Sequence, residues 1–240
     1  MSRRFLVLQH VEVEHPGIFR EFLWADGIAW DTVELDAGHP LPEVDGYDAL
    51  IVMGGPMDVW EEQLHPWLSD EQAAIRRAVA ELDKPYLGVC LGHQLLAAAL
   101  GGEVGKAVRG EVGIMDVELT PAGVGHAYFA EVETRFATLQ WHGAEVRSAP
   151  AGTTVLARSP ACAIQALAAG TRAFSIQFHV EVIASTVDDW YAIPAYRDGL
   201  HQALGADGIH GFRAAAAAHM PRFNALARRL YDNWMRRAFV

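Results

Sequence analysis

The sequence predicts an α/β fold in which a doubly wound, mostly parallel sheet is flanked by helices. Two observations support this prediction. Strand-like and helix-like stretches alternate through the first half of the chain, and short apolar runs of strand length end at turns rich in glycine. Because right-handed crossovers bring the carboxyl ends of parallel strands to one edge of a sheet, we expect a ligand site at that edge.

The elements of this alternating part are expected in βαβ order, since apolar runs indicate strands and apolar residues three or four apart indicate helices. In chain order they are a strand at residues 5–9, a helix at 16–25, strands at 30–35 and 48–53, a helix at 67–82, a strand at 85–89 and a helix at 91–100. Gly54-Gly55-Pro56 ends the strand at 48–53, and Gly101-Gly102 ends the last of these helices.

The pattern then changes to shorter strands, at residues 114–119, 136–140, 153–156, 162–167 and 173–178. We expect them to finish the main sheet and to add a small antiparallel portion. After Ile183 the chain is expected to be helical, with an apolar stripe after Pro221 made of Phe223, Leu226, Leu230 and Trp234. This pattern predicts a domain at residues 1–190 and a helical C-terminal extension at residues 191–240 that packs on the same domain.

The composition limits the class of protein. Hydrophobic residues make up 51% of the chain, enough for a buried core, and the formal charge of −11 disfavours nucleic acid and anionic membrane surfaces, which attract clustered Lys and Arg. No apolar run has the length of a membrane span, and the apolar part of the start is too short for a signal peptide. Two cysteines do not make a disulfide framework. We expect a cytoplasmic protein with no nucleic-acid or membrane partner.

One cysteine stands at a predicted strand-to-helix turn, in the pattern Gly88-x-Cys90-x-Gly92. A nucleophile on such a strained turn needs small neighbours, because Cβ atoms there would collide. The positive end of the helix dipole favours the thiolate of Cys90, and the N–H of Leu91 is free to bind an oxyanion. An isolated cysteine is more often a buried structural thiol. The glycines favour a nucleophile for Cys90, whereas Cys162, in an apolar stretch, is expected in the core.

The strand expected at 173–178 leads into His179 and Glu181. Side chains two apart on a strand point the same way, so the Glu181 carboxylate can fix the tautomer of His179 and stabilise its imidazolium. A cysteine needs such a base and orienting group to act in acyl transfer. Alone, His-x-Glu is more often a solvated strand face, and it gains weight beside Cys90. Zinc deaminases also use His-x-Glu, but with a following Pro-Cys-x-x-Cys that this chain lacks.

Two further turns are candidates for ligand contacts. The glycines of Gly54-Gly55-Pro56 let the backbone present N–H groups to an oxyanion, although such a turn is more often a plain chain reversal. Gln140-Trp141-His142-Gly143 ends a predicted strand and is either a substrate-contact loop or the place of a satisfied structural histidine. The stretch after Gly101 lacks the pattern of a phosphate-binding loop, and the histidines show no metal-ligand spacing, so we expect no metal and no cofactor.

Gly54-Gly55-Pro56, then Gly88-x-Cys90-x-Gly92-x-Gln94, then Phe178-His179-x-Glu181 together resemble the class I, triad-type glutamine amidotransferase family, over roughly residues 45–190. The segments 113–119 and 140–143 are most similar to the glutaminase part of GMP synthases and their stand-alone relatives. The resemblance implies a flavodoxin-like sheet and an activity toward the side-chain amide of glutamine.

The resemblance also implies roles for single residues. Cys90 forms a γ-glutamyl thioester, His179 moves the proton from the thiol to the departing ammonia, and Glu181 orients His179. The N–H groups of Gly55 and Leu91 are expected to bind the oxyanion. The residues expected to hold the substrate are Gly54, Gln94, Trp141 and His142.

Two features depart from the GMP synthase pattern. Ala144, followed by Glu145, stands where such chains usually carry Asp, and the 240 residues contain no ATP-pyrophosphatase pattern. Ammonia would then be released or passed to a separate synthetase subunit, and a homodimer is left open. The same triad would serve a stand-alone γ-glutamyl peptidase acting on γ-glutamyl amides. A catalytically idle binding module is the third interpretation.

Overall fold

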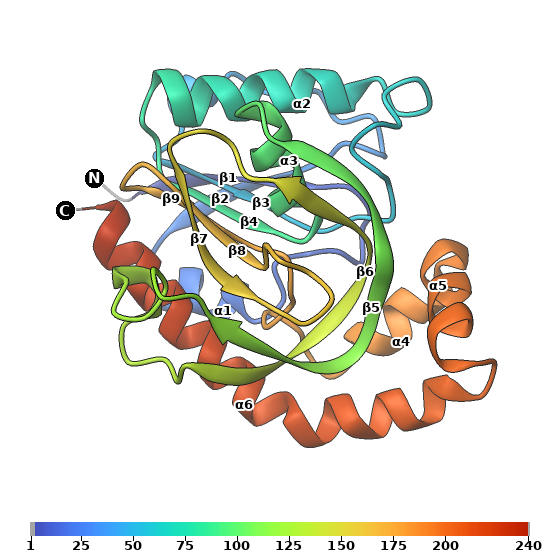
Figure 1. Cartoon of the computed structure of the whole chain (residues 1–240). Coiled ribbons are helices and arrows are strands. Elements are labelled where there is room, and N and C mark those ends of the chain that lie inside the picture. Colours follow the sequence, from blue (N-terminus) through green and yellow to red (C-terminus); the bar gives the residue numbers. More distant parts are fainter. Residues whose placement is uncertain (1–2, 240) are drawn as a thin grey trace.

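The computed structural model describes residues 3–239, which form one mixed sheet covered by helices on both faces (Figure 1). The strands are β1 (Arg4–Gln9), β2 (Ala29–Glu34), β3 (Ala49–Val52), β4 (Tyr86–Val89), β5 (Glu103–Leu119), β6 (Arg135–Ser148), β7 (Thr153–Arg158), β8 (Ala166–Ala169) and β9 (Ala173–Ile176). The helices are α1 (Phe19–Ala25), α2 (Trp67–Arg76), α3 (Leu91–Ala99), α4 (Thr186–Ala192), α5 (Pro194–Leu204) and α6 (Gly208–Ala238). Three short helical turns are η1 (Val44–Gly46), η2 (Arg77–Glu81) and η3 (Ala127–Phe129).

The sheet has a parallel half and an antiparallel half, in the order β2-β1-β3-β4-β9-β8-β7-β5-β6. Pairing is parallel from β2 to β9 and antiparallel from β9 to β6. The predicted fold class is confirmed, and the antiparallel part extends further than the sequence suggested. The parallel strands end at one edge, as doubly wound sheets do, and this edge carries the residues discussed below.

Both faces of the parallel half are buried, which explains why its strands are continuous apolar runs. On one face, Phe5 and Phe174 pack in the same core as Trp234 of α6. On the other face, Leu6 and Val52 pack with residues of α2 and α3. Burial of each such side chain contributes about 1.5–3 kcal/mol to the free energy of unfolding. The two covering layers therefore hold the ligand edge of the sheet rigid.

Most expected elements of the first half are found within a few residues of their predicted bounds. The helix expected from residue 16 begins at Phe19, because Gly17 adopts φ +51° and lies so close to the chain that a Cβ on it would be 1.8 Å from the Glu181 carbonyl oxygen. The helix expected at 67–82 is α2 followed by the π-helical turn η2. Local periodicity therefore predicted these elements, and tertiary contacts determine the residues at which they begin and end.

The predictions for the later strands were less accurate. The segment 140–143 is not a loop at a strand end but lies inside β6, because the ladder between β5 and β6 continues through the pair Glu111–His142. Residues 162–165 are not in a strand, since Ser159 and Cys162 close a turn before β8 begins. His179 and Glu181 lie beyond the end of β9, where His179 forms an isolated bridge with Leu139.

The C-terminal helices cover the sheet rather than extending away from it. In the predicted stripe of α6, Phe223, Leu230 and Trp234 are buried and Leu226 is partly buried. Helix α6 runs through Pro221 instead of starting after it. The described ends of the chain lie side by side (Figure 1), with the Arg3 guanidinium 4.1 Å from the centre of the Phe239 ring. The division of the chain at residue 190 stays a prediction.

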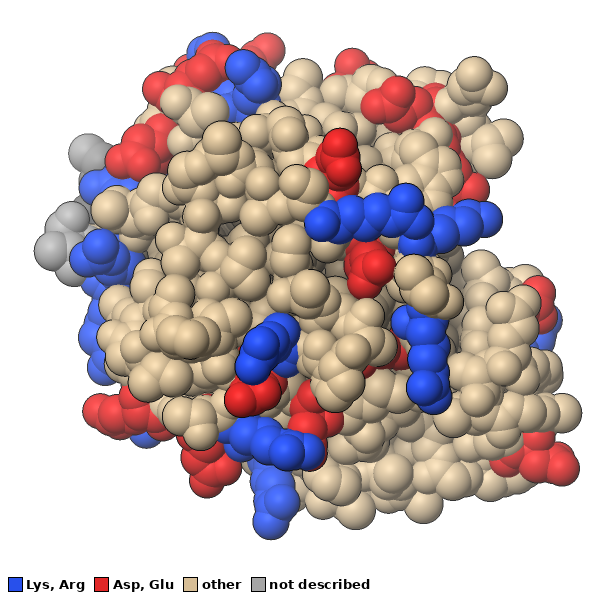
Figure 2. Space-filling view, in the orientation of Figure 1, with Lys and Arg blue, Asp and Glu red and all other residues tan. Residues whose placement is uncertain are grey.

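The surface is acidic overall but mixed in detail. On the face seen in Figure 2, Lys and Arg side chains are interspersed with Asp and Glu around broad uncharged areas. Among residues 3–239, no helix combines the length and the apolarity that a bilayer crossing requires.

Candidate active site

Cys90 occupies a strained turn between β4 and α3. Its backbone adopts φ +52° and ψ −103°, in the positive-φ region that residues with a Cβ rarely enter. A Cβ on Gly88 would lie 2.7 Å from the Gly92 carbonyl oxygen, and one on Gly92 would lie 2.1 Å from the Val52 carbonyl oxygen. The sequence prediction that both glycines are required is therefore confirmed. Cys90 lines a cavity of about 600 Å³.

The side chains of His179 and Glu181 form a buried pair beside this turn. His179 Nδ1 lies 2.7 Å from Glu181 Oε1, and Glu181 Oε2 accepts a 3.0 Å hydrogen bond from the Val180 N–H. Burial lowers the pKa of His179, but the Glu181 carboxylate and the nearby Cys90 side chain outweigh it, so the pKa of His179 lies well above its ordinary value. The Glu181 carboxylate therefore favours the protonated form of His179.

Two backbone N–H groups near Cys90 have no protein acceptor among the described residues. The N–H groups of Gly55 and Leu91 donate to no acceptor within residues 3–239. Gly55 lines the same cavity as Cys90, and Leu91 directly follows Cys90 at the start of α3. Gly54 is buried, and a Cβ on it would lie 2.6 Å from Glu14 Oε2. The predicted oxyanion donors are therefore available, whereas Gly54 is enclosed by its neighbours.

Gln94, predicted to hold the substrate, is bound mainly to the protein. Its Nε2 donates to the Ala144 carbonyl oxygen at 3.1 Å and to Gln177 Oε1 at 3.0 Å, which leaves Oε1 for a ligand. Gln177 Nε2 in turn lies 3.6 Å from Cys90 Sγ. Sequence reasoning missed Gln177, although it shares the alternating run of His179 and Glu181, and that alternation was the signal that could have found it.

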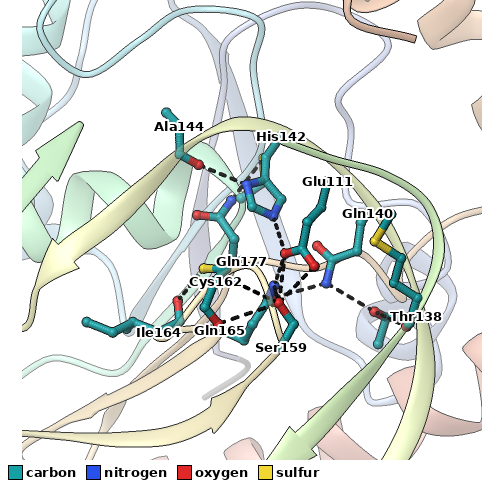
Figure 3. A network of polar contacts seen from close by, with 12 residues as sticks. Glu111, Thr138, Gln140, His142, Ala144, Ser159, Cys162, Ile164, Gln165 and Gln177 are labelled. Atoms are coloured by element: carbon teal, nitrogen blue, oxygen red, sulfur yellow. Dashed lines mark hydrogen bonds and ion pairs between the residues drawn. The ribbon is translucent and has the colours of Figure 1, made fainter. Parts of the chain in front are cut away.

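His142 belongs to a buried polar network (Figure 3). Its Nε2 lies 3.2 Å from Glu111 Oε2 and its Nδ1 lies 2.9 Å from the Ala144 carbonyl oxygen. Glu111 also accepts hydrogen bonds from Ser159 and Gln165 (Figure 3). Both ring nitrogens of His142 are thus occupied, which favours the structural interpretation of this histidine while leaving it at the cavity wall.

Two other predicted residues lie beside this network and the cavity. Cys162 is buried as expected, and burial raises the pKa of its thiol to about 12. Trp141 lines the cavity, and its Nε1 donates to the Tyr196 carbonyl oxygen at 3.1 Å. Its ring packs against Trp190 and Tyr196. Trp141 therefore ties α4 and α5 to β6.

Sequence reasoning missed several buried polar residues near the cysteine turn. Glu14 accepts a hydrogen bond from the Tyr196 hydroxyl through Oε1, and its Oε2 has no partner within residues 3–239. Burial raises the pKa of Glu14 to about 7, against the opposing effects of His179 and the Tyr196 hydroxyl. His10 pairs with Glu71 at 2.9 Å. Their position in the sequence could have marked them as candidates. His10 and Glu14 come soon after β1, whose carboxyl end lies at the ligand edge of the sheet.

A strained cysteine turn beside a buried histidine–carboxylate pair, at the carboxyl edge of a parallel sheet, is suited to acyl transfer from an amide or ester. The model of the glutamine amidotransferase class-I family matches residues 27–192, and the chain belongs to this family. Membership implies an amidotransferase or amide hydrolase activity.

Relatives of known name fall into two kinds. The chain is 36% identical to the GMP synthase of Aeropyrum pernix over 165 residues, which cover 66% of this chain and 30% of that protein. It is 27% identical to gamma-glutamyl peptidase 3 of Arabidopsis thaliana over 182 residues, which cover 72% of each protein. The crystal structure of a glutamine amidotransferase from Thermotoga maritima matches with a TM-score of 0.85 and 28% identity, over 98% of each chain. The chain thus corresponds to a minor part of the synthase.

Proposed function

We propose that this chain hydrolyses the side-chain amide of glutamine through a γ-glutamyl thioester on Cys90. The observation that carries the proposal is the buried pair of His179 and Glu181, with Nδ1 2.7 Å from the carboxylate, near the strained turn of Cys90. This geometry provides a nucleophile, a base and an orienting group in one buried site.

The proposed reaction has two halves. The Cys90 thiol gives its proton to His179 and the sulfur attacks the amide carbon. The N–H groups of Gly55 and Leu91 bind the resulting oxyanion, and each such donor lowers the barrier by about 2.7–4 kcal/mol. The intermediate expels ammonia, which takes the proton from His179. Water, deprotonated by the same imidazole, then hydrolyses the thioester to glutamate and the free thiol.

The glutamine is proposed to lie between Gly55 and the segment 141–144, which line the cavity together with Cys90. Gln94 contributes its remaining acceptor Oε1. Trp141 and His142 form the wall, and their side-chain bonds to the protein keep that wall rigid. Gly54 contributes by having no side chain, which lets its backbone and the Glu14 carboxylate lie close together.

The proposal for the fate of the ammonia is supported by the relatives rather than by the site. The likeness to a GMP synthase supports transfer to a synthetase on a separate chain, and release into solvent is the other outcome. A cytoplasmic location is part of the proposal, because both cysteines are free thiols.

A second candidate function, γ-glutamyl peptide or amide hydrolysis, is favoured by the size of the cavity. Glutamine has ten non-hydrogen atoms, and at no more than about 30 Å³ per atom it fills roughly 300 Å³. The cavity holds about 600 Å³, and the α5 residues on its wall include the small Ala195, Gly199 and Ala203 beside Tyr196, Gln202 and Leu204. A leaving group larger than ammonia therefore fits, and the acyl half of the reaction is unchanged.

One set of measurements tests these functions. Glutamate release is followed with glutamine and with γ-glutamyl amides of larger amines, and the specificity constants decide between the two candidates. Intact-mass analysis after treatment with a diazo-ketone analogue of glutamine reports the reactivity of Cys90. Turnover by the Cys90→Ala protein at the wild-type rate refutes the mechanism, and an unlabelled Cys90 favours an idle binding module.

A further inference from the structure

A second buried histidine–glutamate pair lies behind the Gly54–Gly55 turn. His10 directly follows β1, and Glu71 lies in α2; both side chains are 0% exposed. His10 Nε2 lies 2.9 Å from Glu71 Oε1 and 3.1 Å from Oε2, and His10 Nδ1 lies 2.8 Å from the Gly54 carbonyl oxygen. The pair therefore connects α2 to the backbone just after the carboxyl end of β3.

The contacts define the protonation of His10. A carboxylate and a carbonyl oxygen are both acceptors, so only an imidazolium with a proton on each nitrogen can donate to both. Burial lowers the pKa of His10, but Glu71 raises it more, with smaller contributions from the Gly54 carbonyl and from Glu14. The Trp67 ring stacks on the imidazole with centroids 5.6 Å apart. His10 is thus a fixed double donor.

The anchored carbonyl sets the direction of the next N–H. A trans peptide is planar and its C=O and N–H point in opposite directions, so the Gly55 N–H points away from the His10 ring. Gly55 lines the cavity with Cys90, and its N–H has no acceptor within the part of the chain that the structure describes. Two successive glycines would otherwise rotate this peptide at little cost.

We propose that His10 and Glu71 are positioning residues that hold the Gly54–Gly55 peptide with the Gly55 N–H toward the oxyanion formed at Cys90; this inference rests on the proposed function. Packing supports the same role. A Cβ on Gly55 would lie 2.7 Å from His10 Cβ and 2.9 Å from Leu91 Cδ2, so His10 backs the peptide directly. The cation at the carbonyl also polarises the peptide and strengthens its N–H as a donor.

A purely structural role predicts a different outcome. A buried ion pair is weak support for stability, and loss of one partner destabilises the fold without selecting one catalytic step. A positioning role instead lowers kcat while KM stays nearly constant, because the oxyanion exists only in the transition state and intermediate. It also predicts rescue by a side chain that restores the donor to Gly54.

The test compares His10→Phe, which keeps a ring but no donor, with His10→Asn, whose amide N–H can reach the Gly54 carbonyl. For glutamine hydrolysis we expect His10→Phe to lower kcat by about 10²–10³-fold, the effect of losing one oxyanion donor. KM should change by less than about threefold, and His10→Asn should recover most of kcat. Glu71→Gln, which leaves a neutral acceptor, should lower kcat by roughly tenfold. Urea unfolding of each variant measures stability in parallel.

Wild-type kcat in His10→Phe overturns the inference, as does an equal loss in the Phe and Asn variants that follows their stability. Crystal structures of the wild-type and His10→Phe proteins provide a readout that needs no turnover. We expect the Gly54 carbonyl to rotate when the donor is lost, and an unchanged peptide overturns the inference. A wild-type protein inactive on glutamine and on γ-glutamyl amides contradicts the proposed function instead, and the two structures still decide the role of His10.

Discussion

Two buried histidine–glutamate pairs lie at the same edge of the sheet and differ in the third group that each imidazole meets. His179 contacts Glu181 through Nδ1 and has the Cys90 side chain nearby, a group that can exchange a proton. His10 contacts Glu71 through Nε2, and its Nδ1 meets the Gly54 carbonyl, which cannot take a proton at neutral pH. Under the proposed function, the same residue pair transfers a proton in one place and is a fixed donor in the other.

The largest difference is expected when the proton-transfer histidine is removed. His179→Asn should lower kcat for glutamine by roughly 10⁴-fold or more, as with other nucleophile–base pairs that act as a unit. Ammonia release measures the loss. The matched control is His210→Asn, on an exposed position of α6, which should keep the wild-type rate. A His179→Asn protein within tenfold of wild type would place the base elsewhere.

Removing the charge of Glu181 sharpens the comparison. Glu181→Gln should lower kcat by about 10²–10⁴-fold, because the imidazolium loses its carboxylate and its tautomer is no longer held. Since Glu181 raises the pKa of His179, its loss should lower that pKa. NMR titration of the His179 ring should show this fall as a midpoint at lower pH. An unchanged midpoint would show that Glu181 does not tune His179.

Glu14 lies within electrostatic reach of both pairs, and its effect should be on stability. Burial raises its pKa from 4.5 to about 7, so the folded protein holds this proton more tightly than the unfolded chain. The contribution of this proton to the free energy of unfolding is fully present below pH 4.5 and is lost as the pH rises through 7. Its size is about 3 kcal/mol. Glu14→Gln cannot lose this proton. Between pH 4.5 and 8, its free energy of unfolding, measured with urea, should therefore rise relative to that of the wild type by about 3 kcal/mol. Parallel pH curves for the two proteins would contradict this.

The smallest effect is expected at the other cysteine. Cys162 is buried, and its pKa of about 12 keeps it a thiol at pH 8. Native protein treated with iodoacetamide should carry a single label, and Cys90→Ala protein should carry none. Intact-mass analysis before and after unfolding measures this. A label on native Cys90→Ala protein would show that Cys162 is accessible.

The parallel half and the nucleophile turn could be predicted because their signals are local. A strand buried on both faces must be an apolar run, and a strained turn at Cys90 needs Gly88 and Gly92 within two positions. The long strands β5 and β6 were only partly predicted. Their ladder pairs residues such as Glu111 and His142, and a pairing of that kind leaves no periodic mark near either residue.

The sequence by itself determined the fold class, the cysteine turn and the spacing that lets Glu181 reach His179, because each depends on neighbours within a few positions. Only the tertiary structure decided that the His179–Glu181 pair lies near the Cys90 turn, that Gln94 is held by Gln177, and that His10 and Glu71 stand behind Gly54. The physical reason is that hydrogen bonds between buried groups depend on distance in space, and crossovers of the chain bring together residues that no local pattern relates.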